Sequence, residues 1–241
     1  MDEQKIMDLR INGMGQAAGG TYGKISTDGI ATLNGDTVCT SITSNGSLKL
    51  KGSLRAEKLR MNGKISVEGT LGGEQLRVDG MLKIAGDVRS EDVDIHGMLT
   101  LGGSASGENL EIDGGLKLGR DAEFETFKVY GGFQIGGMLN AGTLEIFMVG
   151  TCRAKELGGG RIQVRRKPSA RNLLAWISSS KVVCLTAEVI EGDYIDLEET
   201  KAEVVRGNSV RIGPGCQIGR VEYRDHYEVD PKATVGSSIQ V

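Results

Sequence analysis

The stretch LRVDGMLKIAGDV (Leu76–Val88) alternates apolar and polar residues on both sides of Gly80. Such alternation places the apolar residues of each half on one face of a short strand, and the glycine between them permits a turn. A β-hairpin would account for a single copy of this pattern. A repeat protein would show the pattern again at a fixed spacing, so the spacing decides between the two.

The pattern recurs every seventeen residues. The positions two and four residues before and after the repeated glycine provide 28 slots, and 26 of them are apolar. The exceptions are Thr27 and Ser44, whereas a composition of 39% hydrophobic residues would fill only about eleven slots by chance. A second glycine follows six residues later in six of the seven repeats, and Arg120 occupies that slot in the other. The repeated glycines are Gly29, Gly46, Gly63, Gly80, Gly97, Gly114 and Gly131.

Each repeat provides three short sides. Two strands flank the glycine, and a third side begins near residues such as Leu54 and Leu71 and then reaches a small residue. Three sides with glycine at the corners describe one coil of a β-solenoid, in which neighbouring coils pair in parallel and the inward residues form a continuous core. We therefore predict an all-β protein, a parallel β-helix with 17-residue coils. The small residues of the third side are Cys39, Ala56, Gly73, Ser90, Gly107 and Ala141.

The chain divides into four parts. Residues 1–24 form a glycine-rich entry in which LRING (Leu9–Gly13) is interpreted as a worn first coil, and residues 25–167 form the regular solenoid. Residues 168–187 lack alternation at their start and are expected to be a linker or a capping segment. Residues 188–241 return to strand-like alternation, either as further coils of a different size or as a small separate β-rich unit.

Composition excludes several classes of protein. The chain has 241 residues, a net charge of −3, 37 glycines and only three prolines, without the three-residue period of collagen. Cations and anions are interspersed, which argues against nucleic-acid binding. The first residues show no secretory signal and no apolar run is long enough to cross a bilayer, so we expect a cytoplasmic protein. The four scattered cysteines are typical of small apolar residues rather than metal ligands.

The motifs that resemble catalytic sites are weak. GMGQAAGG (Gly13–Gly20) resembles a dinucleotide-binding loop, but strand-like sequence follows where a helix N-terminus would be needed, so a turn or cap is favoured. His96 occupies an exposed turn slot. Asp94 and Glu111 share an outward slot that holds Arg77 in another repeat, which indicates a solvated ladder rather than a catalytic dyad. We expect no enzyme activity and no cofactor, nucleotide or metal; a carbohydrate-acting β-helix enzyme is the weaker alternative.

A basic and apolar segment follows the regular repeats. Cations beside a tryptophan-containing apolar cluster are typical of a peripheral membrane contact, whereas the same residues also suit a cap folded over the solenoid. Both interpretations stay open, with the cap favoured. The candidate residues are Arg165, Arg166, Lys167, Arg171, Leu173, Leu174, Trp176 and Ile177.

The two ends of a solenoid expose unpaired strand edges, which recruit another chain unless they are capped. Contact through these ends would join copies of the chain without nucleotide. If residues 188–241 stack on the second end, that contact moves to residues 210–241. The candidate contact residues are Ile6, Leu9, Ile11 and Tyr22 at one end and Phe147, Met148 and Val149 at the other.

The repeats, with LRINGMG and GGTYGKI ahead of them, resemble the bactofilins, a family of polymer-forming bacterial cytoskeletal proteins, over residues 9–167. The stretch IEGDYIDLEETKAEVVRGNSVRIGPG is similar to the tail of longer members from Gram-positive bacteria. The resemblance implies a right-handed, three-sided β-helix that assembles into non-polar filaments with itself or a paralogue.

The same resemblance implies a scaffold for cell shape, envelope organisation or motility, often at the membrane. Typical members flank one solenoid with proline-rich tails, whereas this chain has three prolines and a second β-rich region. The filament contacts of the family therefore cannot be assigned by position. The alternative is a scaffold that binds other proteins, does not polymerise and has internally capped ends.

Overall fold

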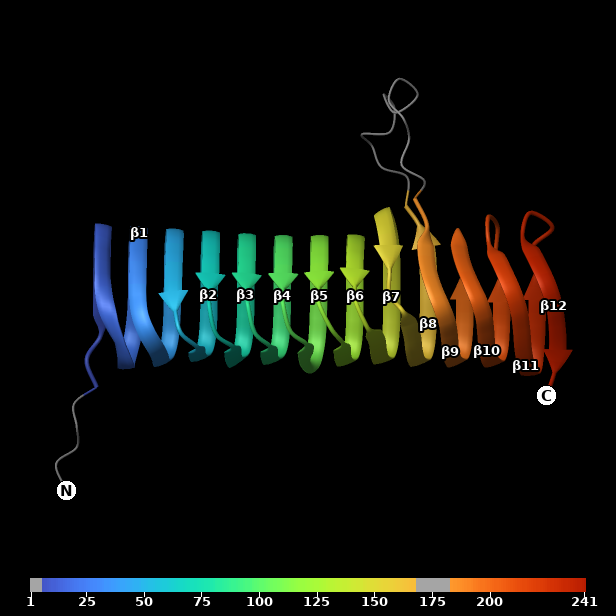
Figure 1. Ribbon diagram of the computed structural model, residues 1–241, viewed down its shortest axis with the longest axis horizontal. Helices are drawn as coiled ribbons and strands as arrows, with labels where there is room; N and C mark the ends of the chain where they lie inside the picture. Colours follow the sequence, from blue (N-terminus) through green and yellow to red (C-terminus); the bar gives the residue numbers. More distant parts are fainter. Residues whose placement is uncertain (1–5, 168–182) are drawn as a thin grey trace, which may run out of the picture. The chain divides into compact units, whose positions relative to one another are not determined.

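The computed structural model describes residues 6–167 and 183–241, which form β-strands and no helix (Figure 1). The fold class is therefore confirmed: the protein is an all-β solenoid. The strands are β1 (Leu9–Lys51), β2 (Leu54–Val67), β3 (Leu71–Ile84), β4 (Val88–Leu101), β5 (Ala105–Leu118), β6 (Ala122–Ile135), β7 (Met138–Arg153), β8 (Glu156–Arg166), β9 (Leu185–Leu197), β10 (Thr200–Ile212), β11 (Gln217–Val229) and β12 (Thr234–Gln240).

The chain forms two compact units, one of residues 1–110 and 117–119 and the other of residues 111–116 and 120–241. In the first unit, β1 to β4 pair in parallel in the order of the chain, and each residue lies opposite the residue seventeen positions later. Gly63, for example, lies opposite Gly80, and Gly80 lies opposite Gly97. The predicted 17-residue coil is confirmed by this register.

The core is built from the predicted inward positions. In β3, Leu71 opens the third side, Leu76 and Val78 follow the next corner, and Leu82 and Ile84 follow the glycine; all five are at most 2% exposed. Because strand side chains alternate between faces, each short side contributes its inward residues to the core and its neighbours to solvent. The core is narrow, which explains why Leu, Ile and Val fill most of it.

The corners require glycine for two separate reasons. All seven repeated glycines have positive φ, +133° at Gly80, where a side chain is strained. A Cβ atom at Gly80 would also lie 2.1 Å from the carbonyl oxygen of Gly63 in the preceding coil. The glycines therefore stack directly on one another, and any side chain would push two coils apart.

The register changes in the second unit at β7. Met148 lies opposite Gly131, but Phe133 lies opposite Cys152, so β7 has two extra residues within the stretch 149–151. Met148 takes the glycine slot and is fully buried. The slot seventeen residues after Gly131 thus holds methionine in place of glycine, and the register shifts directly after it.

The C-terminal residues continue the coils. β9 pairs in parallel with β8, β10 pairs with β9 and β11, and β12 pairs with β11. Lys201 lies opposite both Thr186 and Gln217, and Gln217 lies opposite Thr234, so the coils lengthen from 15 to 16 to 17 residues. Of the two interpretations of residues 188–241, the structure shows further coils of a different size.

Candidate assembly surfaces

The first coil of the first unit has small inward residues after its turn. Leu9 is half-buried and Ile11 is 9% exposed, but the inward positions after the turn are Gly15 and Ala17. The side chain of Tyr22 folds back along the coil, where its hydroxyl donates to the Ala18 carbonyl oxygen at 2.8 Å. Small inward residues leave this end of the core thinly covered.

The residues that precede β1 cover only part of this coil. The Gly23 N–H donates to the Met7 carbonyl oxygen at 3.0 Å, and the Lys24 N–H donates to Asp8 Oδ1 at 2.7 Å. Ile6 is 59% exposed. No described strand precedes β1, so the outer edge of residues 9–22 has no strand partner among the described residues.

In the last coil of the second unit, β12 covers only part of β11. β12 pairs with residues 217–223 of β11, and within the described chain no strand pairs with the outer edge of residues 224–229. An inward side chain here is partly uncovered: Val229 lies opposite the buried Ile212 and is 44% exposed. The rings of Tyr223 and Tyr227 stack with centroids 5.1 Å apart over this end. The end therefore combines an open edge with a partial aromatic cover.

The second predicted end contact is wrong as placed. Phe147, Met148 and Val149 lie in β7, which pairs with β6 and β8, so they do not form an end of the coils. Phe147 stacks on Tyr130 with ring centroids 4.6 Å apart, and Lys167 Nζ lies 5.0 Å from the Phe147 ring centroid. The reason for the error is that residues 185–240 continue the coils. The alternative stated above then applies, in which the contact at this end is made by residues 210–241.

The described part of the basic segment is engaged within the second unit. Arg165 forms an ion pair with Asp196, and that bond holds the pKa of Arg165 above its ordinary value. Arg166 forms a second ion pair, with its Nη1 atom 3.1 Å from Glu199 Oε1. Arg171, Leu173, Leu174, Trp176 and Ile177 lie outside the described residues. No helix in the described ranges is long and apolar enough to cross a membrane.

The weak catalytic candidates do not assemble into a site. His96 is exposed, and its Nδ1 lies 3.5 Å from carboxylate oxygens of both Asp79 and Asp94. Asp94 forms an ion pair with Arg77 at 2.8 Å, as expected for a solvated ladder. Across residues 6–167 and 183–241, no group of three or more His, Cys, Asp or Glu side chains could hold a metal ion.

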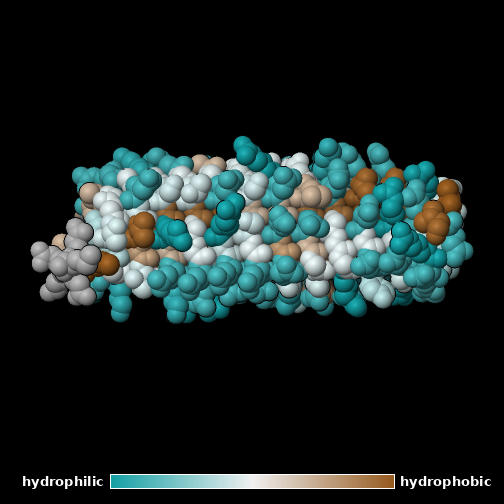
Figure 2. Space-filling view, turned by 90° about the horizontal axis from the view of Figure 1, so that it is seen from below, coloured by the Kyte–Doolittle hydropathy of each residue, from teal (hydrophilic) through white to brown (hydrophobic). Residues whose placement is uncertain are grey.

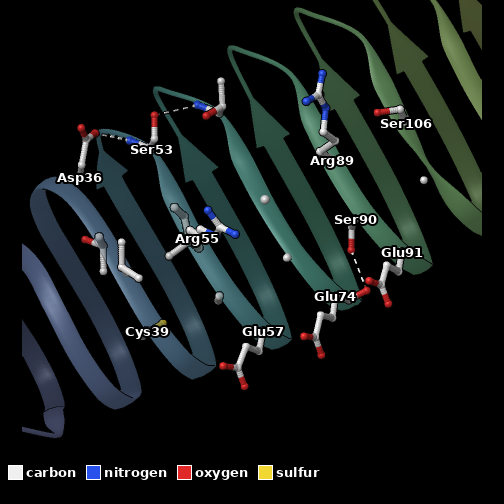
Figure 3. A pocket seen from close by; sticks show the side chains of 18 of the residues that line it. Asp36, Cys39, Ser53, Arg55, Glu57, Glu74, Arg89, Ser90, Glu91 and Ser106 are labelled. Atoms are coloured by element: carbon white, nitrogen blue, oxygen red, sulfur yellow. Dashed lines mark hydrogen bonds between the residues drawn. The ribbon is translucent and has the colours of Figure 1, made fainter. Parts of the chain in front are cut away.

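Sequence analysis missed a groove along the third side of the first unit. It has a volume of about 850 Å³ and extends from Asp36 to Glu108 (Figure 3). Its lining includes the small residues of the third side, namely Cys39, Ala56, Gly73, Ser90 and Gly107. In Figure 2, a pale band of intermediate hydropathy runs between hydrophilic side chains on one face of the molecule.

The two rims of the groove differ. One rim has Asp36, Ser53 and Thr70, and two of these side chains accept a hydrogen bond from the next coil: the Ser53 N–H donates to Asp36 Oδ1 at 2.7 Å, and the Thr70 N–H donates to Ser53 Oγ at 3.2 Å. The other rim carries one exposed glutamate per coil. The signal in the sequence is glutamate at a 17-residue interval, at Glu57, Glu74, Glu91 and Glu108.

Two relatives from Bacillus subtilis (strain 168) are similar to this chain. The uncharacterized protein YhbE is 43% identical over 106 residues, which is 44% of each chain. The uncharacterized protein YhbF is 41% identical over 100 residues, 41% of this chain and 40% of the relative. The aligned parts thus span less than half of either relative. No family model matches the chain, and no solved structure gives a significant match.

Proposed function

We propose that this protein is a structural scaffold that assembles end to end, without nucleotide, into non-polar filaments that organise cell shape, the envelope or motility machinery. The observation that carries the proposal is the open state of both terminal coils. The outer edge of residues 9–22 and the outer edge of residues 224–229 have no strand partner among the described residues. Unpaired edges beside core side chains are templates for another copy of the same coil.

The resemblance to bactofilins supports the same function. A contact between like ends would be isologous, and alternating isologous contacts at two ends produce a filament without polarity. A paralogue with the same coil dimensions would also fit such an end, and YhbE and YhbF are two similar proteins of one organism. A cytoplasmic location and a peripheral membrane contact through residues 165–177 belong to this proposal as expectations.

A second candidate is a scaffold that binds other proteins as a monomer. The observation that favours it is the stacked pair Tyr223 and Tyr227, together with the Gln240 side-chain amide, which donates to the Arg224 carbonyl oxygen at 2.8 Å. These contacts cover part of the last coil as an internal cap would. This candidate predicts a monodisperse protein at every concentration.

Negative-stain electron microscopy of the purified chain in moderate salt, without nucleotide, tests the proposal. We expect filaments, and we expect Leu9→Arg and Val229→Arg each to shorten them, because an arginine that a contact buries at a coil end lacks a partner. Val149→Arg is the matched control, since Val149 is 42% exposed, close to the 44% of Val229, but lies in β7, which pairs with β6 and β8. Monomers at high concentration would instead favour the capped scaffold.

A further inference from the structure

Asparagines of the first unit directly precede a glycine at four positions, and all four side chains are exposed. Such a pair is the most susceptible to spontaneous deamidation, because glycine has no side chain to hinder attack by its own backbone nitrogen on the asparagine amide. Since exposure is the same at all four, the backbone around each glycine decides which of them reacts. The four asparagines are Asn12, Asn34, Asn45 and Asn62.

The reaction requires the main chain to rotate between the two residues. The glycine nitrogen attacks the asparagine Cγ atom and gives up its proton to water, and ammonia leaves as a cyclic imide closes. Water then opens the ring at either carbonyl group, which produces aspartate or isoaspartate. Water is consumed and ammonia is released, so no oxidant or reductant takes part. A corner held by coils on both sides resists this rotation, because those coils must open first.

The corners at Gly46 and Gly63 are held from both sides. Gly63 lies opposite Gly46 in the preceding coil and Gly80 in the following one. A Cβ atom at Gly46 would lie 2.3 Å from the Gly29 carbonyl oxygen, and one at Gly63 would lie 2.1 Å from that of Gly46. Backbones stacked this closely cannot rotate unless the neighbouring coils separate.

The asparagine side chains at these two corners are held as well. Asn45 Nδ2 donates a hydrogen bond to Asp28 Oδ1 at 2.9 Å. The two terminal atoms of the Asn62 amide each lie 3.1 Å from an oxygen, one of Asn45 and the other of Asp79. The side-chain amides therefore form a ladder that keeps each Cγ atom in place.

Asn34 precedes a glycine at a different corner, which is also enclosed. A Cβ atom at Gly52 would lie 2.6 Å from the Gly35 carbonyl carbon, and one at Gly35 would lie 3.6 Å from Gly19 Cα. Asn34 Nδ2 donates to the Ala17 carbonyl oxygen at 3.4 Å. Coils on both sides therefore hold this corner too.

The corner at Gly13 is held from one side only. No described strand precedes β1, and a Cβ atom at Gly13 would meet nothing within 4 Å, whereas one at Gly29 would lie 2.2 Å from the Gly13 carbonyl oxygen. The side-chain oxygen of Asn12 accepts a hydrogen bond from Arg10 Nε at 3.4 Å. Negative charge develops on this oxygen when Cγ is attacked, so the arginine favours the reaction.

We propose that Asn12 is a site of spontaneous deamidation, and that its conversion disables the first coil as an assembly surface. Aspartate here adds a negative charge one coil away from Asp28, which precedes Gly29 as Asn12 precedes Gly13. Like charges at the spacing of adjacent strands, about 4.8 Å, repel each other. Isoaspartate also adds a carbon atom to the main chain, so the alternation before the corner no longer matches the alternation after it.

The chemistry at Asn12 depends on the first coil alone, whereas its effect on filaments rests on the proposed end-to-end assembly. A partner coil stacked on residues 9–22 would hold the Gly13 corner from its second side, as the interior corners are held. Subunits joined through this end are therefore protected, and subunits that stay free lose it with age.

Peptide mapping tests the chemistry. Dilute wild-type protein is kept at mildly alkaline pH, then unfolded and digested with trypsin, which releases Asn12 in residues 11–24 and Asn62 in residues 61–64. Asn62 is the matched control, because it also precedes a corner glycine but lies in an interior coil.

We expect Asn12 to deamidate at least about tenfold faster than Asn62 in the folded protein, because only the interior corner requires coils to open. The two rates should converge when the protein is kept in urea instead. Loss of Asn12 that is no faster than loss of Asn62 in the folded protein would overturn the proposal.

Electron microscopy tests the consequence. Aged wild-type protein is concentrated at neutral pH and compared with the fresh protein, with Asn12→Asp and with Asn12→Gln, and circular dichroism confirms that each one folds. We expect shorter filaments from the aged wild type and from Asn12→Asp. Aged Asn12→Gln should keep the full length, because glutamine closes a cyclic imide far more slowly.

Filaments of full length from Asn12→Asp or from the aged wild type would overturn the loss of this end. Fresh wild-type protein without any filaments would overturn the proposed function, and the effect on assembly with it. The peptide map decides the chemistry at Asn12 in either case.

Discussion

Thr27 Oγ1 donates a hydrogen bond to Ser44 Oγ at 2.7 Å inside the core of the first unit. Both residues are 1% exposed, and they occupy equivalent inward positions in adjacent coils. They are also the two polar exceptions in the inward slots of the repeat. Each hydroxyl therefore satisfies the other, because a buried hydroxyl without a hydrogen bond destabilises the fold.

This pair predicts a non-additive pair of substitutions. Thr27→Val leaves the Ser44 hydroxyl without this partner, and we expect a loss of about 1–3 kcal/mol in the free energy of unfolding. Adding Ser44→Ala removes the orphaned group, so the double variant should be more stable than Thr27→Val alone. Urea unfolding of the four proteins of this double-mutant cycle measures the coupling. Equal, additive losses would show that the bond contributes nothing.

The glycine corners predict a large difference in stability between substitutions at two glycines of β3. Gly80→Ala combines strain at φ +133° with a Cβ atom 2.1 Å from a backbone oxygen, and we expect a loss of more than about 2 kcal/mol. Gly72 has no positive φ and its nearest contact is 3.8 Å, so Gly72→Ala is the matched control, expected within about 0.5 kcal/mol of the wild type. Thermal unfolding of both variants makes the comparison; similar midpoints would contradict the stacking of glycines.

The buried thiols predict alkaline instability. Burial raises the pKa of Cys152 to about 12, and burial followed by the nearby Glu57 raises that of Cys39 to about 11. A raised thiol pKa means that the folded state favours the neutral form. The stability that each buried neutral thiol adds to the folded state is therefore fully present below the unfolded pKa of about 8.5. It is lost as the pH rises towards the folded pKa values of about 11 and 12.

Cys152→Ala, used as a variant without this titration, should lose less stability between pH 8.5 and 11 than the wild type. Thiol labelling at pH 8 provides a second check. Cys184 is partly exposed and should react in the folded protein, whereas Cys39, Cys152 and Cys216 should react only after unfolding. Rapid labelling of all four thiols under native conditions would contradict their burial.

The hydrogen bonds that Asp36 and Asp87 accept from the next coil predict that these aspartates stabilise the coils. Asp87 Oδ1 accepts a bond from the Ser104 N–H, and it lies where a Cβ atom at Gly103 would fall, at 2.0 Å. We expect Asp87→Ala to cost about 1–2 kcal/mol, because a backbone donor loses a charged acceptor. Glu91→Ala, on the glutamate rim of the groove, is the control and should be near neutral. Chemical unfolding would refute the assignment if both changes had the same effect.

The solenoid could be predicted because the sequence features that specify it act over a few neighbouring residues. Alternation such as Leu76 and Val78 assigns an inward face within one strand, and a glycine such as Gly80 marks a corner wherever φ must be positive. These constraints are visible without knowing what lies in the next coil. The change of coil size after residue 185 could be read only as two alternatives, because alternation defines strands but not their partners.

The candidate contacts depended on stacking between coils, and there sequence reasoning was partly wrong. Phe147 and Met148 look terminal because the glycine repeat fails at that point. The structure places β8 and β9 after them, since β8 pairs with β7 and β9 pairs with β8. Loss of the repeat therefore marked an insertion within the solenoid rather than its end.

The amino-acid sequence by itself determined the period, the inward residues and the glycine corners of this protein, because strand alternation and backbone strain act within a few neighbouring residues. Only the tertiary structure decided which edges stay open, that Thr27 is paired with Ser44, and that Glu57 and Glu74 line one rim of a groove. Those relationships join residues seventeen or more positions apart. They exist because parallel coils bring such residues about 4.8 Å from one another.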